Sequence, residues 1–342
     1  MPTPAAGRPS PTAAEEHVSD WSGVRLHVVT GKGGTGKTTV AAALAIALAG
    51  HGRRTLLVEV EDRQGIAQLF DSPPLPYEER KVAVGAGGGD VLALAVDPEE
   101  ALLEYLEMFY RLGRAGRGLR RIGAIDFATT IAPGMRDVLL TGKVYEAVRR
   151  RKGSTPVYDA VVLDAPPTGR ITRFLGVNEE VAGLARVGPI RGQADSIMSL
   201  LRSPMTAVHL VTLLEEMPVQ ETGDAVAELA KAGLPVGGVV VNMVRAPLLK
   251  QADLTAAAKG TLDRAEVVAG LEAAGIGRGA NAVDALLAEA GEHAERVALE
   301  KRQRKAVKAL GRPTYDLPMA LEGVDLGALY EMAEQLCRQG MA

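Results

Sequence analysis

The fold of this chain is decided by the stretch Gly31-Lys32-Gly33-Gly34-Thr35-Gly36-Lys37-Thr38-Thr39. It fits the phosphate-loop pattern, in which a glycine, any four residues and a second glycine are followed by Lys and then Ser or Thr. An apolar, strand-like segment, residues 24–30, precedes it, and an alanine-rich segment of strong helix formers, residues 40–49, follows it. Strand, glycine loop and helix in this order are the context that the pattern requires.

The residue types in this loop suit a triphosphate and its cation. Glycines allow consecutive backbone N–H groups to turn toward phosphate oxygens, and the positive end of the following helix points at the same anion. The pattern predicts that Lys37 contacts the β- and γ-phosphates and that Thr38 supplies a hydroxyl to Mg²⁺. The predicted nucleotide-binding residues of the loop are Gly31, Gly33, Gly34, Thr35, Gly36, Lys37, Thr38 and Thr39.

The composition limits the class of protein. The chain has 342 residues, 47% of them hydrophobic, which is enough for one large α/β domain or two small ones. Its net charge of −3 gives no general attraction to nucleic acid or anionic membranes. The single cysteine, Cys337, excludes an intrachain disulfide and a four-cysteine zinc site.

No apolar run reaches the roughly 18 residues that a membrane span needs, so we expect no transmembrane segment. Residues 1–20 are rich in Pro, Ala, Thr and Glu and lack an apolar signal-peptide core. We expect them to form a disordered tail, and we expect a cytoplasmic protein.

Acidic residues follow two further apolar segments. Residues 54–60 lead into Glu61, and residues 159–163 lead into Asp164. Ligands of open parallel sheets bind beyond the carboxyl ends of the strands. Glu61 is therefore a candidate for positioning water or Mg²⁺, although it could also be a solvated strand-end acid. Asp164 is expected to hold Mg²⁺, most simply through a water molecule.

Two motifs resemble a known family. Lys32 follows the first glycine directly, so that the run 32–38 resembles the deviant Walker A motif. The run Asp164-Ala165-Pro166-Pro167-Thr168-Gly169-Arg170 resembles switch II of the arsenite-pump and tail-anchored-protein targeting ATPases, Asp-Thr-Ala-Pro-Thr-Gly-His-Thr, with Arg170 in place of the histidine. The resemblance covers about residues 24–338, and among bacterial relatives it is greatest to the actinobacterial anion-transporting ATPases, which often occur as paired paralogues.

The resemblance implies roles for further residues. In this class the early lysine crosses a dimer interface to the partner's nucleotide, so Lys32 is expected to be catalytic together with Lys37, Glu61 and Asp164. The family ends one strand with an asparagine that binds adenine, which Asn242 matches, and the loop that covers the adenine ends here at Pro318. The predicted switch II residues are Asp164, Pro167, Thr168 and Gly169, with Gly169 as the hinge.

Glu61 departs from the family. The family has the signature Asp-Pro-Ala-His, whose aspartate orients the attacking water, whereas this chain has Glu61-Asp62-Arg63-Gln64. Glutamate is one methylene longer, and a displacement of about 1 Å can cost on the order of a hundredfold in rate. Either Glu61 still positions water, or the chain hydrolyses slowly and pairs with a more active paralogue.

More than one role fits each of two other segments. The arginine-rich stretch 111–121 and the basic run 149–152 fit a partner or nucleic-acid surface, but also an ordinary solvated face. The helical segment 176–204, with Met198 and nearby Met205, matches the part of the targeting ATPase that lines a groove for an apolar client helix. Two methionines are also common as core filling.

The predicted fold is α/β, a doubly wound, mostly parallel sheet of the SIMIBI P-loop NTPase type. Residues 21–342 form one ATPase domain, with a helical subdomain at about 98–152 and 176–207, and residues 72–89 form turns and an irregular loop.

The predicted function is that of a Mg²⁺-dependent ATPase with ATP as its nucleotide. Its nucleotide state would open and close a dimer of identical or paralogous chains, and the dimer would handle a protein or membrane-related client, reached at the membrane through a partner. The alternatives are a low-turnover, nucleotide-gated scaffold subunit and a partition-type DNA-binding ATPase. The net charge and switch II disfavour the partition-type ATPase.

Overall fold

The computed structural model describes residues 19–61, 63–110, 133–184, 189–276 and 280–342. Residues 1–18 of the predicted tail and the arginine-rich stretch 111–121 lie outside the described residues. The predicted division into one ATPase domain with a helical subdomain remains a prediction.

The centre of the fold is an eight-stranded sheet in the order β10-β9-β8-β1-β7-β2-β4-β3. Every neighbouring pair is parallel except β3 and β4. The strands are β1 (Leu26–Gly31), β2 (Thr55–Glu59), β3 (Arg80–Val84), β4 (Asp90–Ala95), β7 (Ala160–Asp164), β8 (Thr206–Thr212), β9 (Val236–Val244) and β10 (Thr314–Pro318). A separate two-stranded ribbon joins β5 (Arg151–Lys152) and β6 (Thr155–Pro156). The predicted doubly wound, mostly parallel sheet is confirmed.

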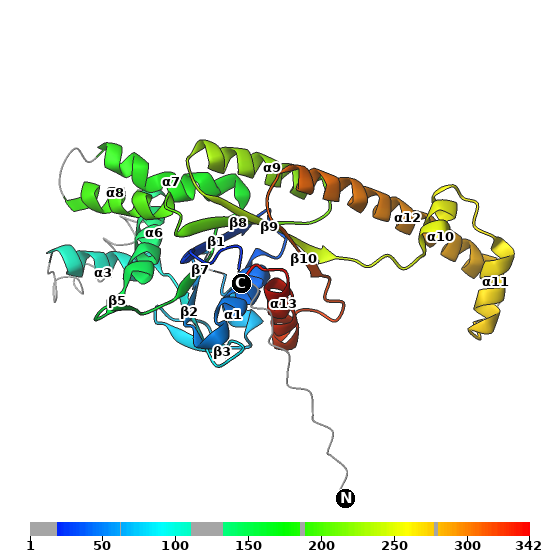
Figure 1. The fold of residues 1–342 in the computed structure, drawn as a ribbon, viewed down its shortest axis with the longest axis horizontal. Coiled ribbons are helices and arrows are strands. Elements are labelled where there is room, and N and C mark those ends of the chain that lie inside the picture. The colour runs from blue at the N-terminus through cyan, green and yellow to red at the C-terminus, as the bar shows by residue number, and fades with distance from the viewer. Residues whose placement is uncertain (1–18, 62, 111–132, 185–188, 277–279) are drawn as a thin grey trace, which may run out of the picture.

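Helices cover both faces of this sheet, which explains why its central strands are apolar along their whole length. In Figure 1, α7, α8 and α9 lie on one side of the sheet and α1 and α13 on the other. The buried residues divide accordingly into two large clusters, one per face. The helices on the α1 face are α1 (Lys37–Leu48), η1 (Gly50–Gly52), α2 (Gly65–Leu69) and α13 (Leu326–Arg338). Those on the opposite face are α3 (Pro98–Tyr110), α6 (Pro133–Arg149), α7 (Thr168–Leu184), α8 (Pro189–Leu201) and α9 (Glu216–Lys231).

Helix α1 is almost completely buried, because it lies between the sheet and α13. Its alanines let it approach both the sheet and α13, which packs along it. This places the N-terminus of α1 directly at the carboxyl end of β1, where the phosphate loop lies.

The edge of the sheet differs from the prediction for residues 72–89. Instead of an irregular loop throughout, residues 80–84 form the edge strand β3, which is antiparallel to β4. The glycine run 85–89 is the hairpin turn between them, closed by a hydrogen bond of 2.7 Å from Gly85 N to Gly89 O. The strand was missed because an exposed edge strand lacks the apolar run of a central one.

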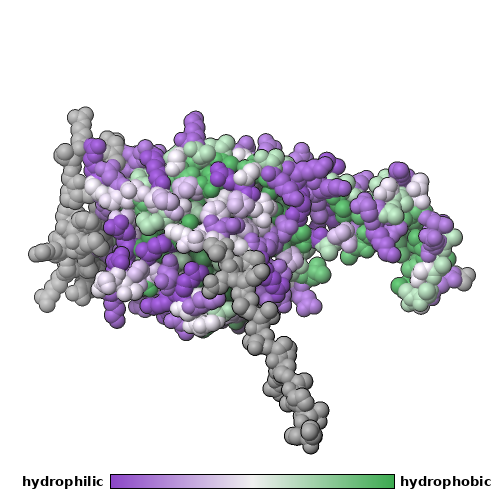
Figure 2. All heavy atoms as spheres, in the orientation of Figure 1, coloured by the Kyte–Doolittle hydropathy of each residue, from purple (hydrophilic) through white to green (hydrophobic). Residues whose placement is uncertain are grey.

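Three helices between β9 and β10 form an arm at the opposite end of the molecule from α3 and α6 (Figure 1). They are α10 (Gln251–Ala258), α11 (Arg264–Ala273) and the 30-residue α12 (Ala280–Ala309). Figure 2 shows apolar surface on this arm. Ile276, just after α11, and Leu286, in α12, are large hydrophobic residues that are 55% and 39% exposed. None of the helices in the described ranges is long and apolar enough to cross a membrane.

Candidate nucleotide-binding site

The phosphate loop joins β1 to α1, and its glycines are needed for two reasons. Gly34 and Gly36 have φ angles of +88° and +83°, which L side chains rarely adopt. A Cβ atom at Gly31 would lie 2.3 Å from the Val211 carbonyl oxygen, and one at Gly36 would lie 2.4 Å from Asn242 Nδ2. A Cβ at Gly33 or Gly34, in contrast, would meet no atom within 4 Å. This open space beside the loop fits phosphate groups.

The N-terminus of α1 suits an anion. Its N-cap, Gly36, makes no side-chain cap hydrogen bond, and the first turn holds no acidic residue. The first N–H groups of the helix are therefore not satisfied by a cap. Lys37 in this turn is 8% exposed and forms no hydrogen bond or ion pair with any described residue, although its charge acts on Asp164.

Thr38 and Asp164 meet beside the loop. Thr38 donates a hydrogen bond of 2.7 Å to Asp164 Oδ2, at the end of β7. The other oxygen, Oδ1, is buried and has no partner among the described residues. Burial raises the pKa of Asp164 to about 6, with the charges of Glu59 and Glu61 adding to the increase, while Thr38 and Lys37 oppose it. A hydroxyl beside a buried, under-coordinated carboxylate is a donor set that Mg²⁺ prefers.

Glu59 is a site residue that the sequence interpretation missed. It is the last residue of β2, it is 4% exposed, and it lies opposite Asp164 in the strand register. Its Oε1 accepts a hydrogen bond of 2.8 Å from Gly65 N, at the start of α2. An acidic residue inside the apolar run 55–60 was the available signal, but the family alignment drew attention to Glu61 instead.

Glu61 lies just beyond β2, next to two arginines. Its Oε1 is 4.0 Å from Nη1 of Arg170, and its Oε2 is 3.8 Å from Nη2 of Arg63. The glutamate that replaces the family aspartate therefore contacts the arginine that replaces the family histidine. Glu59 and Glu61 both line a cavity of about 370 Å³ at the ends of β2 and β4.

Lys32 is paired within its own chain. Its Nζ lies 2.5 Å from Oε1 of Glu221 on α9, and Thr168 Oγ1 donates a longer hydrogen bond of 3.4 Å to the other oxygen of Glu221. Glu221 thus links the glycine loop, through Lys32, to the start of α7, through Thr168. The sequence interpretation used Glu221 only as a match to the family, because no local pattern indicates a contact between residues so far apart in the chain.

The predicted switch II segment is attached to β1 at its first residues. Thr30 Oγ1 donates a hydrogen bond of 2.6 Å to Pro166 O, and Ala165 N donates one of 2.9 Å to Val29 O. Pro167 immediately precedes α7, which begins at Thr168. Gly169 therefore lies in the first turn of a helix and not in a loop, and its role as a hinge remains a prediction.

Asn242 supports the loop from the end of β9. It is 4% exposed, and its Nδ2 donates a hydrogen bond of 2.9 Å to the carbonyl oxygen of Thr35. The next residue, Met243, lies near the end of β9 and has a φ of +54°, a left-handed conformation that is unusual within a strand. Pro318 is exposed and lies opposite Val244 in the register of β9 and β10. Contacts of Asn242 and Pro318 with adenine remain predictions.

Comparison with known proteins agrees with this geometry. Residues 24–206 match the family described as anion-transporting ATPase. The chain is 56% identical to ATPase BagA of Mycobacterium tuberculosis over 321 residues, which is 94% of each chain. It is 26% identical to ATPase GET3 of Kluyveromyces lactis over 63% of this chain and 71% of that protein. It is 28% identical to the arsenical pump-driving ATPase of Acidiphilium multivorum over 67% of this chain and 41% of that protein. From the matched family and these identities, this chain belongs to the anion-transporting ATPase family.

Proposed function

We propose that the chain hydrolyses ATP with Mg²⁺ and that its nucleotide state controls the association of two chains. The observation that carries the proposal is the open glycine loop next to the Thr38–Asp164 pair. Together they offer backbone N–H groups for phosphate oxygens and oxygen ligands for a cation.

The residues of the loop would act by position and charge. Backbone N–H groups of residues 33–38 would hold the β- and γ-phosphates, and Lys37 would place its ammonium group against the same oxygens. Thr38 would bind Mg²⁺ directly and Asp164 through a water molecule. The bound Mg²⁺ would neutralise charge that develops on the phosphates during transfer.

Glu61 would orient the attacking water, with Glu59 holding the loop that carries it. The hydrogen bond from Gly65 N to Glu59 fixes the chain just after Glu61.

The dimer would form across the face that carries the phosphate loop, with Lys32 reaching the partner's nucleotide. The partner would be an identical chain or a paralogue. Release of Lys32 from Glu221 would then accompany closure, and Thr168 would lose its bond to the same carboxylate at that moment. The closed dimer would handle a protein or membrane-related client from the cytoplasm, an expectation that comes from the family resemblance.

A second candidate function is a low-turnover scaffold that responds to ATP binding and relies on a more active paralogue for hydrolysis. The contact between Arg170 and Glu61 favours it, because a carboxylate held by a guanidinium is less free to orient water.

Phosphate release by the purified chain separates the two functions. With Mg²⁺ and ATP, we expect steady turnover that falls on the order of a hundredfold in Lys37→Ala. The control is Lys308→Ala, which removes an exposed lysine of α12 and is expected to change neither turnover nor ATP binding. ATP binding with negligible phosphate release in the unmodified chain would favour the scaffold, and no binding of Mg²⁺ and ATP at all would refute both.

A further inference from the structure

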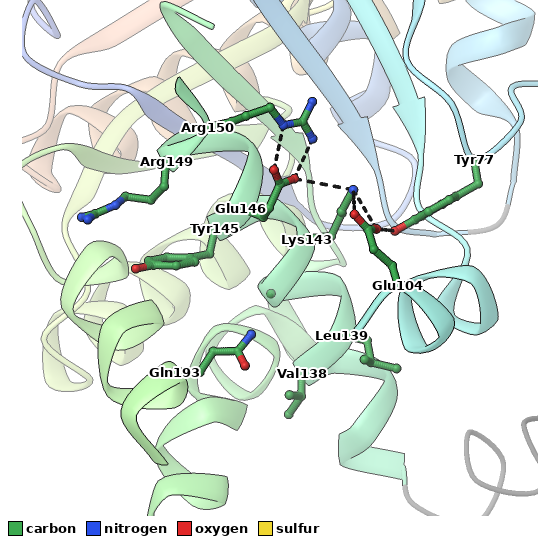
Figure 3. Close-up of a pocket in the computed structure, with 12 residues that line it drawn as sticks. Tyr77, Glu104, Val138, Leu139, Lys143, Tyr145, Glu146, Arg149, Arg150 and Gln193 are labelled. Carbon is green, nitrogen blue, oxygen red and sulfur yellow. Dashed lines mark hydrogen bonds and ion pairs between the residues drawn. The ribbon is translucent and has the colours of Figure 1, made fainter. Parts of the chain in front are cut away.

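A second cavity lies away from the phosphate loop, between α3, α6 and α8 (Figure 3). Its volume is about 360 Å³, within the range of about 300–1,000 Å³ typical of small-molecule sites. Val138, Leu139 and the rings of Tyr77 and Tyr145 make much of its wall apolar. Gly142 on α6 leaves room in it, because a Cβ atom there would meet only Gln193 Nε2, at 3.8 Å.

The acidic side chains at this cavity are already neutralised. Lys143 Nζ lies 2.8 Å from Oε2 of Glu104 and 3.5 Å from Oε2 of Glu146. Tyr77 donates a hydrogen bond of 2.5 Å to Glu104, and Arg150 donates two, of 2.7 and 2.6 Å, to Glu146. Arg150 also pairs with Glu79, just outside the cavity lining, at 2.5 Å. Figure 3 shows this continuous chain of contacts along one side of the cavity. Among the described residues that line the cavity, a cationic ligand would therefore find no carboxylate that lacks a cationic partner.

Arg149, at the same cavity, carries a positive charge that no described residue neutralises. Its side chain is exposed, and its guanidinium carbon lies 5.8 Å from the centre of the Tyr145 ring, while the structure gives it no ion pair within the described ranges. The amide of Gln193, on α8, is a neutral donor and acceptor in the same cavity. Arg149 is thus the group at this cavity that would attract an anion.

We propose that this cavity binds a small organic anion with an apolar body, namely a carboxylate on an aliphatic chain of medium length. The carboxylate pairs with Arg149, and the chain lies against the Tyr145 ring, Val138 and Leu139. Arginine is suited to this task because its planar fork donates two parallel hydrogen bonds to a carboxylate. This site is independent of the nucleotide site and of the function proposed above.

Isothermal titration of the full chain with decanoate tests the proposal. Decan-1-ol and decylammonium carry the same chain with no charge and with the opposite charge. We expect decanoate to bind most tightly, decan-1-ol more weakly and decylammonium least. Equal binding of all three compounds, tighter binding of decylammonium, or no binding of decanoate would each overturn the proposal.

Two variants locate the site. Arg149→Gln is expected to weaken decanoate binding about fivefold, as for a partly exposed ion pair, and to leave decan-1-ol binding unchanged. Gly142→Leu fills the cavity and is expected to abolish binding of both compounds. The matched controls are Arg302→Gln, at an exposed arginine of α12, and Gly270→Leu, at an exposed glycine of α11.

Thermal unfolding of each variant shows whether it folds, so loss of binding by an unfolded protein is recognised. If Gly142→Leu proves unfolded, Val138→Trp fills the same cavity from a half-buried position on α6. The proposal is wrong if a folded, cavity-filled variant binds decanoate as the unmodified chain does, or if Arg149→Gln weakens decan-1-ol as much as decanoate.

Discussion

Individual glycines of the phosphate loop serve two different purposes, and the structure separates them. Gly31 is required by the fold, because a Cβ atom would overlap the backbone oxygen of Val211 at 2.3 Å. Gly33 is not required by the fold, because a Cβ atom there would enter open space. The motif treats both as glycines of one pattern, whereas the packing distinguishes a structural glycine from one that leaves room for a ligand.

Gly31→Ala is therefore expected to lower the free energy of unfolding by about 1–3 kcal/mol, as overpacking does. Gly33→Ala is expected to leave it within about 0.5 kcal/mol of the unmodified value and to weaken ATP binding at least tenfold. Chemical denaturation and isothermal titration measure the two effects. The assignment fails if Gly33→Ala destabilises the fold as much as Gly31→Ala.

Arg170 offers a second test at the scale of single residues. Arg170→His restores the family residue next to Glu61 and shortens the side chain that contacts it. If Arg170 restrains Glu61, turnover rises, by about tenfold or less, while the affinity for ATP stays the same. Phosphate release over a range of ATP concentrations gives both values. Arg173→His, at an exposed position one turn further along α7, is the control, and a fall in turnover in Arg170→His alone would contradict this role.

At the scale of elements, the contact between β1, α7 and α9 is the part of the site that moves in the proposed cycle. The Lys32–Glu221 pair is about one-third exposed on each side, so it adds at most about 1 kcal/mol to stability. Its larger effect concerns the position of Lys32. While Glu221 holds the ammonium group, Lys32 is not free to contact a partner chain.

Glu221→Gln is thus expected to change unfolding little and to favour dimerisation when ATP and Mg²⁺ are present. Analytical ultracentrifugation, with and without nucleotide, measures the fraction of dimer. Glu228→Gln, two turns further along α9, provides a comparison on the same helix. A dimer fraction that falls or stays constant in Glu221→Gln would mean that the pair does not restrain Lys32.

The sequence predicted those elements that depend on neighbouring residues, and it missed those that depend on contacts between residues far apart in the chain. The order of strand, glycine loop and helix and the central strands follow from local patterns, and the structure confirms this arrangement. Strand β3 was missed because its pairing with β4, and not its own composition, makes it a strand. The contacts of Lys32 with Glu221 and of Asn242 with Thr35 join residues about 200 positions apart, and spacing along the chain carries no information about them.

At the scale of the whole molecule, two buried histidines in adjacent central strands link stability to pH. Gly238 N donates a hydrogen bond of 3.1 Å to His209 Nδ1, so His209 carries its proton on Nε2 and donates it to His27 Nδ1, also at 3.1 Å. Burial lowers the pKa of His27 to about 4, and burial together with the nearby His27 lowers that of His209. Both rings are therefore neutral in the folded chain.

Because the unfolded chain binds a proton at His27 near pH 6.5 and the folded chain only near pH 4, stability falls as the pH falls between these values. Between these pH values the free energy of unfolding falls by about 3 kcal/mol because of His27 alone, and above pH 7 this effect is absent. Denaturation curves at pH 7, 6, 5 and 4.5 measure it. His27→Gln keeps an acceptor for His209 but does not titrate, so its stability should depend less on pH. An equal slope in both proteins would contradict this explanation.

The arm, α10 to α12, is stabilised by fewer buried side chains than the rest of the molecule, here called the body. Among the described residues, the arm has a small buried cluster of its own, Leu254, Ala257 and Ala294, with Leu271 and Val283 also buried, whereas the α1–α13 contact belongs to one of the two large clusters of the sheet. A segment with so few buried contacts opens more readily than the body.

Amides of α10 and α11 are therefore expected to exchange hydrogen much faster than those of β1 and β8. Leu254→Ala should speed exchange in the arm alone, whereas Leu329→Ala, in α13, should lower protection throughout the sheet by about 2–5 kcal/mol. If Leu254→Ala lowers protection of the sheet equally, the arm and the body unfold as one unit.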